Sequence, residues 1–466
     1  MKAFYRRREL GYMSMGVQSK VSLKTVLSYG MGSFGNNIIY ALTSTYLMIF
    51  YTDSVGLNAA AVGTLFLIAR IWDGIADIII GMIVDNTETR FGKFRPYLLI
   101  GGFFAAVATV ACFISPDLSH TGKLIYAYIT YIAWGTSFAI MDIPYWSLSA
   151  TITQDVKERN KVVAFPRTIA AVGSLFASLL TLPLAHYFGN WFMLSLIYAC
   201  ILMITMIITF SGVKENYTVK RQEKQTPKAV WNLFIQNKPL RYLIFSMLLV
   251  ETILTIRTTF SIYYFKYNLN AENIASLYLT LFFTAQIVGA IASPFISNKF
   301  GKKRAAIGGI ALNAVATLTM FVTGFHVMPV MILSFLASFG GGVSNIAQTS
   351  MLADCVEYGE WKTGNRAEGM VFSTNIFKTK VASAVGGAVG GYILSAVGYV
   401  PNQIQSHSTL IWIALIFTII PGILCLLSLV PLAKYELTEK RYLEILQNMK
   451  KRSSRIKEKP AMKVSS

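Results

Sequence analysis

The chain has 466 residues, of which 54% are hydrophobic and only 14% are charged, and its mean hydropathy is +0.52. Soluble proteins carry about a quarter charged residues, so this composition excludes an ordinary soluble domain and predicts a membrane protein. The net charge of +20 lies in short segments between apolar runs, which argues against a nucleic-acid surface. The four cysteines are scattered without metal or disulfide spacing and are interpreted as packing residues.

Apolar runs of about 20 residues, each long enough to cross a bilayer as a helix, recur along the chain. We expect twelve spans, near 26–50, 59–84, 96–114, 124–148, 167–187, 191–212, 240–265, 272–296, 304–323, 327–352, 370–396 and 408–432. The predicted fold class is an all-α membrane protein with twelve transmembrane helices in two six-helix halves of the major facilitator type.

Lysine and arginine crowd alternate loops: the N-terminus, the segments 85–95, 155–167, 214–228 and 299–304, and the tail after Lys434. The other loops are almost free of them, with Lys123 and Lys266 as exceptions. This is the positive-inside pattern, and it predicts a multi-pass protein of the bacterial inner membrane with both termini in the cytoplasm. The basic tail is expected to face solvent and anionic lipid, with no nucleic-acid partner.

A polar, basic stretch at 213–238 divides the chain. We expect a cytoplasmic segment 1–25, a bundle 26–212, a central loop 213–238, a second bundle 239–432 and a basic tail 433–466. The sequence FGKFR at 91–95 follows the second helix of the first half, and FGKKR at 300–304 occupies the equivalent place in the second half. A duplicated six-helix unit places a substrate site between the halves, near the membrane midplane.

The span 59–84 carries Arg70, Asp73 and Asp77, whose spacings of three and four residues place them on one helical face. Two carboxylates one turn apart do not both stay ionised in an apolar helix without a positive charge nearby. A purely structural ion triad is one explanation. We favour a cation or proton site because Arg70 neutralises only one of the two acids.

Asp142 and Trp146 are four residues apart and share a face of the fourth span. A carboxylate accepts sugar hydroxyls while an indole covers the apolar face of the ring, although Trp146 also suits an interfacial anchor. Arg167 opens the fifth span, either as an anchor or as a residue that reaches the cavity.

In the second half, Glu251 and Arg257 are six residues apart and cannot pair along one helix face. Lys378 and Lys380 are two apart and point to opposite faces, so at most one faces the cavity directly. The glycine-rich run at 386–391 predicts close helix packing. A charged cytoplasmic loop follows the tenth span; it is either solvated or forms a gate of salt bridges between the halves, and its candidate gate residues are Asp354, Glu357, Tyr358, Glu360 and Arg366.

From about Tyr29 to Pro401 the sequence resembles the glycoside–pentoside–hexuronide:cation symporter family and, within it, the melibiose permeases. The motifs that carry the resemblance are YGMG at 29–32, FYTD at 50–53, VGTLFL at 62–67 followed by RIWD at 70–73, GKFRP at 92–96, MDIPYWSL at 141–148 and EYGE at 357–360. Several long motifs in the same order make chance similarity improbable.

The resemblance implies roles for particular residues. Asp73 and Asp77 match the acids that bind the coupling cation, and Asp142 matches the sugar-binding acid near that site. Trp146 matches the stacking ring and Arg167 a base that contacts the sugar. A further match, Lys380, is a lysine close to the acids that helps to couple the two sites, since an ammonium among carboxylates substitutes for a cation when the site is empty. Apart from the resemblance, Arg70 is a candidate coupling residue because it shares a helical face with Asp73 and Asp77.

The chain departs from melibiose permeases near the acids. Ala76 and Ala139 replace an asparagine and a threonine, which removes neutral oxygens. Sodium needs a shell of several oxygen ligands, whereas a proton needs one carboxylate, so H⁺ is favoured over Na⁺ as the coupling ion. No cofactor is expected.

Other departures concern the substrate. Asn36 and Asn37 stand where melibiose permeases have lysine and aspartate, and Asn345 replaces a tryptophan. Asn37, Asn345 and Lys380 stay candidate substrate residues. The lost acid and the added Arg257 favour an anionic sugar, such as a hexuronide or a sulfonated sugar; alternatively, Arg257 pairs with an acid elsewhere and the sugar is neutral.

The function that we expect is cation-coupled symport of a sugar or glycoside by alternating access, by a protein that acts as a monomer. The alternatives are a sodium symporter for neutral glycosides, an uncoupled facilitator or exporter and, from another class, a transport-like sugar sensor. A membrane enzyme is not expected, because the sequence offers no constellation of nucleophile, base or metal ligands.

Overall fold

The computed structural model describes residues 20–87, 89–153, 156–217, 234–323, 326–363 and 368–449. Its first group of helices is α2 (Leu23–Ile49), α3 (Ala59–Asp85), α4 (Arg95–Cys112), α5 (His120–Ile152), α6 (Val156–Phe188) and α7 (Trp191–Gly212). The second group is α9 (Lys238–Tyr263), α10 (Glu272–Phe300), α11 (Lys302–Val322), α12 (Val327–Thr363), α13 (Glu368–Ala396), α14 (His407–Phe417) and α15 (Ile419–Ala433). Short π-helical turns, η1 (Phe50–Ser54) and η2 (Tyr264–Asn268), follow α2 and α9.

Each of the twelve predicted spans coincides with helix, and the described residues contain no strand. The last span, 408–432, holds both α14 and α15, which meet at Thr418. Pro421 lies three residues further on. Because proline has no N–H and its ring crowds the carbonyl four residues before it, the helix breaks at this point.

The charged segment after the tenth span is helical as far as Thr363, and our expectation of a loop there was wrong. Leu352, Cys355, Val356 and Gly359 are buried at helical spacing, so the segment continues the amphipathic pattern of α12. Its dense charge concealed this apolar stripe.

Within the described residues, nine helical segments are long and apolar enough to cross a membrane, with α14 and α15 forming one of them. The helices α2, α3 and α13 are not among the nine. These three carry many of the polar and charged residues of the predicted site, among them Asn37, Asp73 and Lys380. They meet other helices across the middle of the molecule, where α3 packs on α13 and α2 on α9. Protein contacts therefore shield the side chains that lipid would not tolerate.

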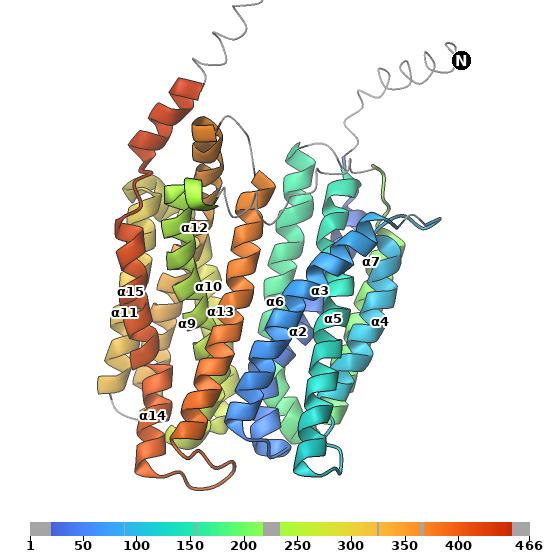
Figure 1. Ribbon diagram of the computed structural model, residues 1–466, viewed down its shortest axis with the longest axis vertical. Helices are drawn as coiled ribbons and strands as arrows, with labels where there is room; N and C mark the ends of the chain where they lie inside the picture. Colours follow the sequence, from blue (N-terminus) through green and yellow to red (C-terminus); the bar gives the residue numbers. More distant parts are fainter. Residues whose placement is uncertain are drawn as a thin grey trace, which may run out of the picture.

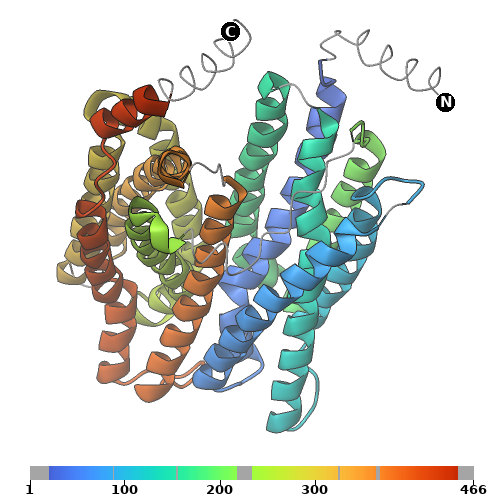
Figure 2. The ribbon, with the colours of Figure 1, turned by 45° about the horizontal axis from the view of Figure 1, so that its top comes forward.

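Figure 1 shows α2–α7 on the right and α9–α15 on the left, and Figure 2 shows the same grouping with α3 beside α13. A further contact between the groups joins α6 and α10. Both ends of the described chain lie at the top of Figure 1, where α2, α4 and α6 begin. We call this the upper end and the opposite one the lower end.

The glycine run of α13 packs against two helices, as the sequence predicted. An ideal Cβ on Gly386 would lie 2.9 Å from Thr255 of α9, and one on Gly390 would overlap the ring of Phe260. On the other face, a Cβ on Gly391 would lie 2.5 Å from the Ala59 carbonyl oxygen of α3. Glycine at these positions lets α13 lie against the backbone of α3 and closely against side chains of α9.

Replacing Gly391 by valine is expected to destabilise the protein by about 1–3 kcal/mol, because the new side chain overlaps backbone that cannot rotate away. The melting temperature of the purified protein in detergent, followed by intrinsic fluorescence, measures the effect. Gly308→Ala on α11 is the control, since its Cβ would have no neighbour within 4 Å. Equal melting temperatures for the two variants would contradict the close packing.

Candidate substrate and cation site

Helix α3 presents its ionisable residues to a lysine of the other helix group. Arg70 Nη1 donates to Asp73 Oδ2 at 3.0 Å, and Arg70 Nη2 donates to the Tyr131 hydroxyl at 3.1 Å. Lys380 of α13 contacts Asp77 Oδ2 and donates to the Asp73 backbone carbonyl at 3.2 Å. The predicted acids and the predicted lysine therefore form one cluster, which joins the two groups of helices.

Asp142 of α5 lies beside this cluster. Its Oδ1 accepts a hydrogen bond from Asn36 Nδ2 of α2 at 2.6 Å, and its carboxylate interacts electrostatically with Asp77 and Lys380. One position that melibiose permeases fill with lysine thus holds Asn36, which here orients the acid by a neutral hydrogen bond. The three predicted cation-site acids share one electrostatic environment.

Two buried oxygens in this region have no hydrogen-bond partner within the described residues, Asp73 Oδ1 and Asn36 Oδ1. Asp73 Oδ1 lies against α5, where a Cβ on Gly135 would be only 2.3 Å away. Glycine at 135 therefore makes room for the carboxylate. A buried polar atom without a partner costs free energy, which a bound proton or cation would recover.

The aromatic part of the predicted sugar site is also assembled. The Arg167 guanidinium lies over the Trp146 ring, 5.8 Å from its centroid, and Tyr145 packs edge-on against the same ring. Trp146 follows Asp142 by one helical turn on α5. Arg167 is exposed and belongs to α6, and it lies beside the indole.

A central cavity of about 180 Å³ lies between the two groups of helices. Residues of α2, α3, α5, α6, α9, α10 and α13 line it, among them Asn37, Tyr40, Arg70, Tyr131, Ser174, Glu251, Thr255, Thr258 and Ser383. An adjoining cavity shares Asn37 and Ser174 and reaches Gln286 and Asn345. Asn37 and Asn345, predicted substrate residues from opposite halves, therefore line adjoining cavities.

Arg257 lies inside the second group of helices, with only 1% of its surface exposed. It donates to Ser334 Oγ at 3.1 Å and to the Tyr278 hydroxyl at 3.4 Å, and its guanidinium lies over the rings of Phe282 and Phe417. No carboxylate within the described residues pairs with it, and its Nε has no partner there. Arg257 lines a small cavity with Glu251 and Asn345.

The sequence left the partner of Glu251 unknown. Lys378 Nζ donates to Glu251 Oε2 at 3.1 Å, so the acid pairs with α13 rather than along its own helix. Lys378 thus faces α9 while Lys380 faces α3. The predicted opposite orientation of the two lysines is confirmed, because α13 is packed between those helices.

The candidate gate residues lie on the upper part of α12. Asp354 accepts from Lys302 Nζ at 2.7 and 2.8 Å, and both residues belong to the second group of helices. Tyr358 packs against Trp361, and Glu357 and Glu360 lie three residues apart on the same helix. Arg366 lies outside the described residues. A gating role for this segment stays a prediction.

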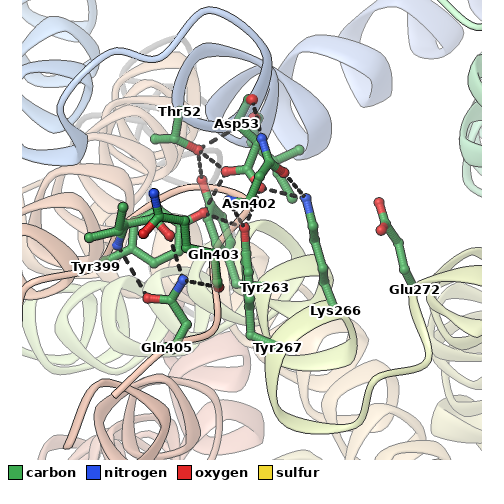
Figure 3. Close-up of polar contacts among 12 residues, drawn as sticks. Thr52, Asp53, Tyr263, Lys266, Tyr267, Glu272, Tyr399, Asn402, Gln403 and Gln405 are labelled. Carbon is green, nitrogen blue, oxygen red and sulfur yellow. Dashed lines mark hydrogen bonds and ion pairs between the residues drawn. The ribbon is translucent and has the colours of Figure 1, made fainter.

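The sequence analysis missed a polar cluster at the lower end, which Figure 3 shows around Asp53. Asp53 Oδ2 accepts from Lys266 Nζ at 2.7 Å and from the Tyr267 hydroxyl at 2.6 Å, and Oδ1 accepts from the Tyr399 hydroxyl. Asn402 Nδ2 donates to the Asp53 carbonyl at 2.6 Å. A bond of 2.8 Å between the hydroxyls of Thr52 and Tyr263 completes what we call the lower-end cluster: Thr52, Asp53, Tyr263, Lys266, Tyr267, Tyr399 and Asn402.

A signal for this cluster was present in the sequence. Lys266 is one of two exceptions to the positive-inside pattern, and Asp53 closes the FYTD motif. Both residues follow the first helix of their group, in η1 and η2. An acid and a base at equivalent ends of a duplicated unit are natural partners across its interface.

Comparisons with known proteins show the family of this chain. The family described as MFS/sugar transport protein matches residues 28–439. The isoprimeverose transporter of Lactiplantibacillus pentosus is 35% identical over 88% of this chain and 88% of its own length. The glucuronide carrier protein homolog of Escherichia coli (strain K12) is 30% identical over 92% of this chain and 96% of its own length.

A solved structure shows the same fold at low sequence identity. The bacterial homolog to the human lysosomal transporter Spinster, in an inward-facing conformation, superposes with a TM-score of 0.67 at 14% identity, over 93% of this chain and 99% of that one. The resemblance to the glycoside–pentoside–hexuronide:cation symporters is confirmed, and the protein is a multi-pass membrane transporter rather than an enzyme. The chain belongs to the MFS/sugar transport protein family.

Proposed function

We propose that the chain is a secondary active transporter that moves a sugar or glycoside together with a proton by alternating access. The observation that carries this proposal is the contact of Lys380, from one group of helices, with Asp77 and the Asp73 carbonyl of the other. In the empty transporter the Lys380 ammonium would occupy the position beside these acids that the coupling cation takes once it has bound. Relatives named as carriers of isoprimeverose and of glucuronides support a sugar as the cargo.

Coupling follows from what binding does to this contact. A proton on Asp73 or Asp77 weakens the attraction of that acid for Lys380, and therefore changes the free energy of the contact between the two halves. A ligand shifts a conformational equilibrium only by binding the two states differently. The acids Asp73, Asp77 and Asp142 supply that difference because they lie where the halves meet.

A proton suits the site better than sodium. The oxygens without a described partner are few, Asp73 Oδ1 and Asn36 Oδ1. Ala76 and Ala139 offer no side-chain oxygen beside them. A sodium ion would need further ligands, whereas a proton needs only the carboxylate. Sodium symport of a neutral glycoside is the second candidate.

An anionic substrate fits the charge of the site. Its ionisable groups comprise five bases, Arg70, Arg167, Arg257, Lys378 and Lys380, and four acids, Asp73, Asp77, Asp142 and Glu251. A bound proton adds one more positive charge, which a carboxylate or sulfonate on the sugar would offset. Arg257, buried without a described acidic partner, is the residue that we assign to this group. Asn37, Asn345, Trp146 and Arg167 would contact the sugar.

In the proposed transport cycle, the bundle of residues 26–212 rotates relative to the bundle of residues 239–432 around the site. Residues 213–238 connect the two bundles, and the functional unit is a monomer. The described residues of the basic segments 85–95 and 299–304 lie at the upper end. We assign this end to the cytoplasm of an inner-membrane protein surrounded by lipid. The lower-end cluster joins the two bundles, whereas Asp354 bonds within its own bundle. These contacts support a state closed toward the outside.

Asp73→Asn is expected to abolish accumulation of sugar against a gradient while sugar exchange across the membrane continues, because the amide cannot carry a proton. Accumulation and counterflow in proteoliposomes with an imposed pH gradient measure the two activities. The wild type with a protonophore serves as the control and should behave like the variant. Normal accumulation by Asp73→Asn, or stimulation of wild-type uptake by sodium at fixed pH, would contradict proton coupling at this site.

Substrate class is tested by thermal stabilisation of the purified protein with methyl β-D-glucuronide, sulfoquinovose and isoprimeverose. The two acidic sugars are expected to raise the melting temperature, and Arg257→Gln to weaken their binding by at least about tenfold, the loss of one charge-assisted hydrogen bond. Stabilisation by isoprimeverose alone would overturn the anionic substrate and leave the sugar transporter standing.

Removing the carboxylate of the lower-end cluster is expected to open that end. Asp53→Ala leaves Lys266 and two tyrosines without their shared acceptor, so a cysteine placed at Ser44, on the central cavity, should react faster with a charged thiol reagent added from outside. Glu272→Gln is the matched control, because this acid lies at the same end and, within the described residues, its one ion pair is with His186, at 4.0 Å. Equal labelling rates in the two variants would argue against a closing role for Asp53.

A further inference from the structure

Helix α9 carries a polar stripe on the face that lines the central cavity. Glu251, Thr255 and Thr258 follow one another at spacings of four and three residues, and all three line the central cavity. The hydroxyls of Thr255 and Thr258 donate to backbone carbonyls of their own helix, which leaves their lone pairs toward other donors. The only charge on this stripe belongs to Glu251.

The Glu251 carboxylate is fixed at the cavity wall by one partner. Lys378 Nζ contacts Oε2 at 3.1 Å, and within the described residues no other group bonds to the carboxylate. Lys378 is almost fully buried, with 4% of its side chain exposed, while Glu251 retains 18%. The ammonium therefore holds one oxygen of the acid, and no described group bonds to the second oxygen of this cavity-lining residue.

Residues of the other bundle face this stripe across the cavity. Asn37 and Tyr40 of α2 and Arg70 of α3 line the same space as Glu251. Glu251 also lines the small cavity that contains Arg257, together with Ser338, whose buried hydroxyl has no partner within the described residues. A molecule bound in the central cavity would contact both bundles, and the α9 side of the cavity includes the carboxylate of Glu251.

We propose that Glu251 is a sugar-binding residue, which accepts hydroxyl hydrogen bonds from the substrate, and that Lys378 is its positioning residue. The proposal rests on the proposed sugar transport. An ionised carboxylate accepts two hydroxyl donors in charge-assisted bonds, roughly twice as strong as neutral ones. With Asp142 on α5 and Glu251 on α9, both bundles would bind the substrate. Substrate binding would therefore change the free energy of moving one bundle relative to the other.

The alternative is a purely structural ion pair between α9 and α13. A pair that only holds two helices together can be exchanged for neutral side chains of similar size with little effect on ligand affinity. Removing one member alone is a poor test, because it leaves a buried charge without its partner. The informative variant is therefore the double one, Glu251→Gln with Lys378→Met.

The experiment uses the full chain in proteoliposomes, with methyl β-D-glucuronide, sulfoquinovose and isoprimeverose as probes. The double variant is expected to raise the KM of the transported probe by at least about tenfold, the ratio that one charge-assisted hydrogen bond supplies. Its maximal exchange rate and its melting temperature should stay near those of the wild type. Lys378→Arg, which keeps the cation behind the acid, should restore most of the affinity in a chain that retains Glu251.

Glu436→Gln is the control, since this exposed acid pairs with Lys238 at the upper end, far from the cavity. A double variant that transports the probe with wild-type KM overturns the inference and leaves sugar transport intact. A wild-type chain that transports none of the three probes contradicts the proposed function and the inference with it. A variant that melts early but binds the probe normally shows a structural pair, and it also overturns the inference.

Discussion

The structure depends on one constraint: a charge inside an apolar bundle must have a partner, which is an opposite charge for the lysines of α13 and hydroxyls and aromatic rings for Arg257. Helix α3 carries two carboxylates, Asp73 and Asp77, of which its own Arg70 can neutralise only one. Helix α13 carries Lys378 and Lys380, and no acidic residue lies within one helical turn of either. Lys380 therefore contacts Asp77 across the boundary between the bundles, while Lys378 contacts Glu251 within the second bundle. These ion pairs lower the free-energy cost of placing α3 and α13 in a membrane, and they also place ionisable groups where the bundles meet.

Backbone proximity makes these contacts possible. The glycines of α13 bring α3 to one face and α9 to the other, so that side chains two residues apart reach opposite bundles. Gly135 plays a similar part on α5 by admitting the Asp73 carboxylate. The glycines thus set the distance between the charged side chains. We infer that the pairing of these charges sets the relative free energies of the conformations of the two bundles.

Much of this was predictable because local signals were strong. Apolar runs of the length of a bilayer located every span, and the spacing of Lys378 and Lys380 indicated their opposite faces. The acids Asp73, Asp77 and Asp142 were predicted from their cost in a membrane and from the family motifs, and the structure brings them close to Lys380. Whether they bind the coupling cation stays a proposal.

Other features depend on contacts between distant segments, which a single sequence does not record. Glu251 and Lys378 are 127 residues apart and Asp53 and Lys266 are 213 apart, so neither pair shows in any local pattern. The helical end of α12 was missed for a different reason. There a run of charge concealed the buried stripe that includes Cys355 and Val356.

The central claim is that a proton replaces Lys380 as the partner of the acids when sugar is carried. Its most direct test is a pH electrode in a lightly buffered suspension of cells that produce the chain, to which methyl β-D-glucuronide or isoprimeverose is added. The account predicts a transient rise in external pH that a protonophore removes. Uptake of either sugar at the same rate with no change in external pH would contradict it.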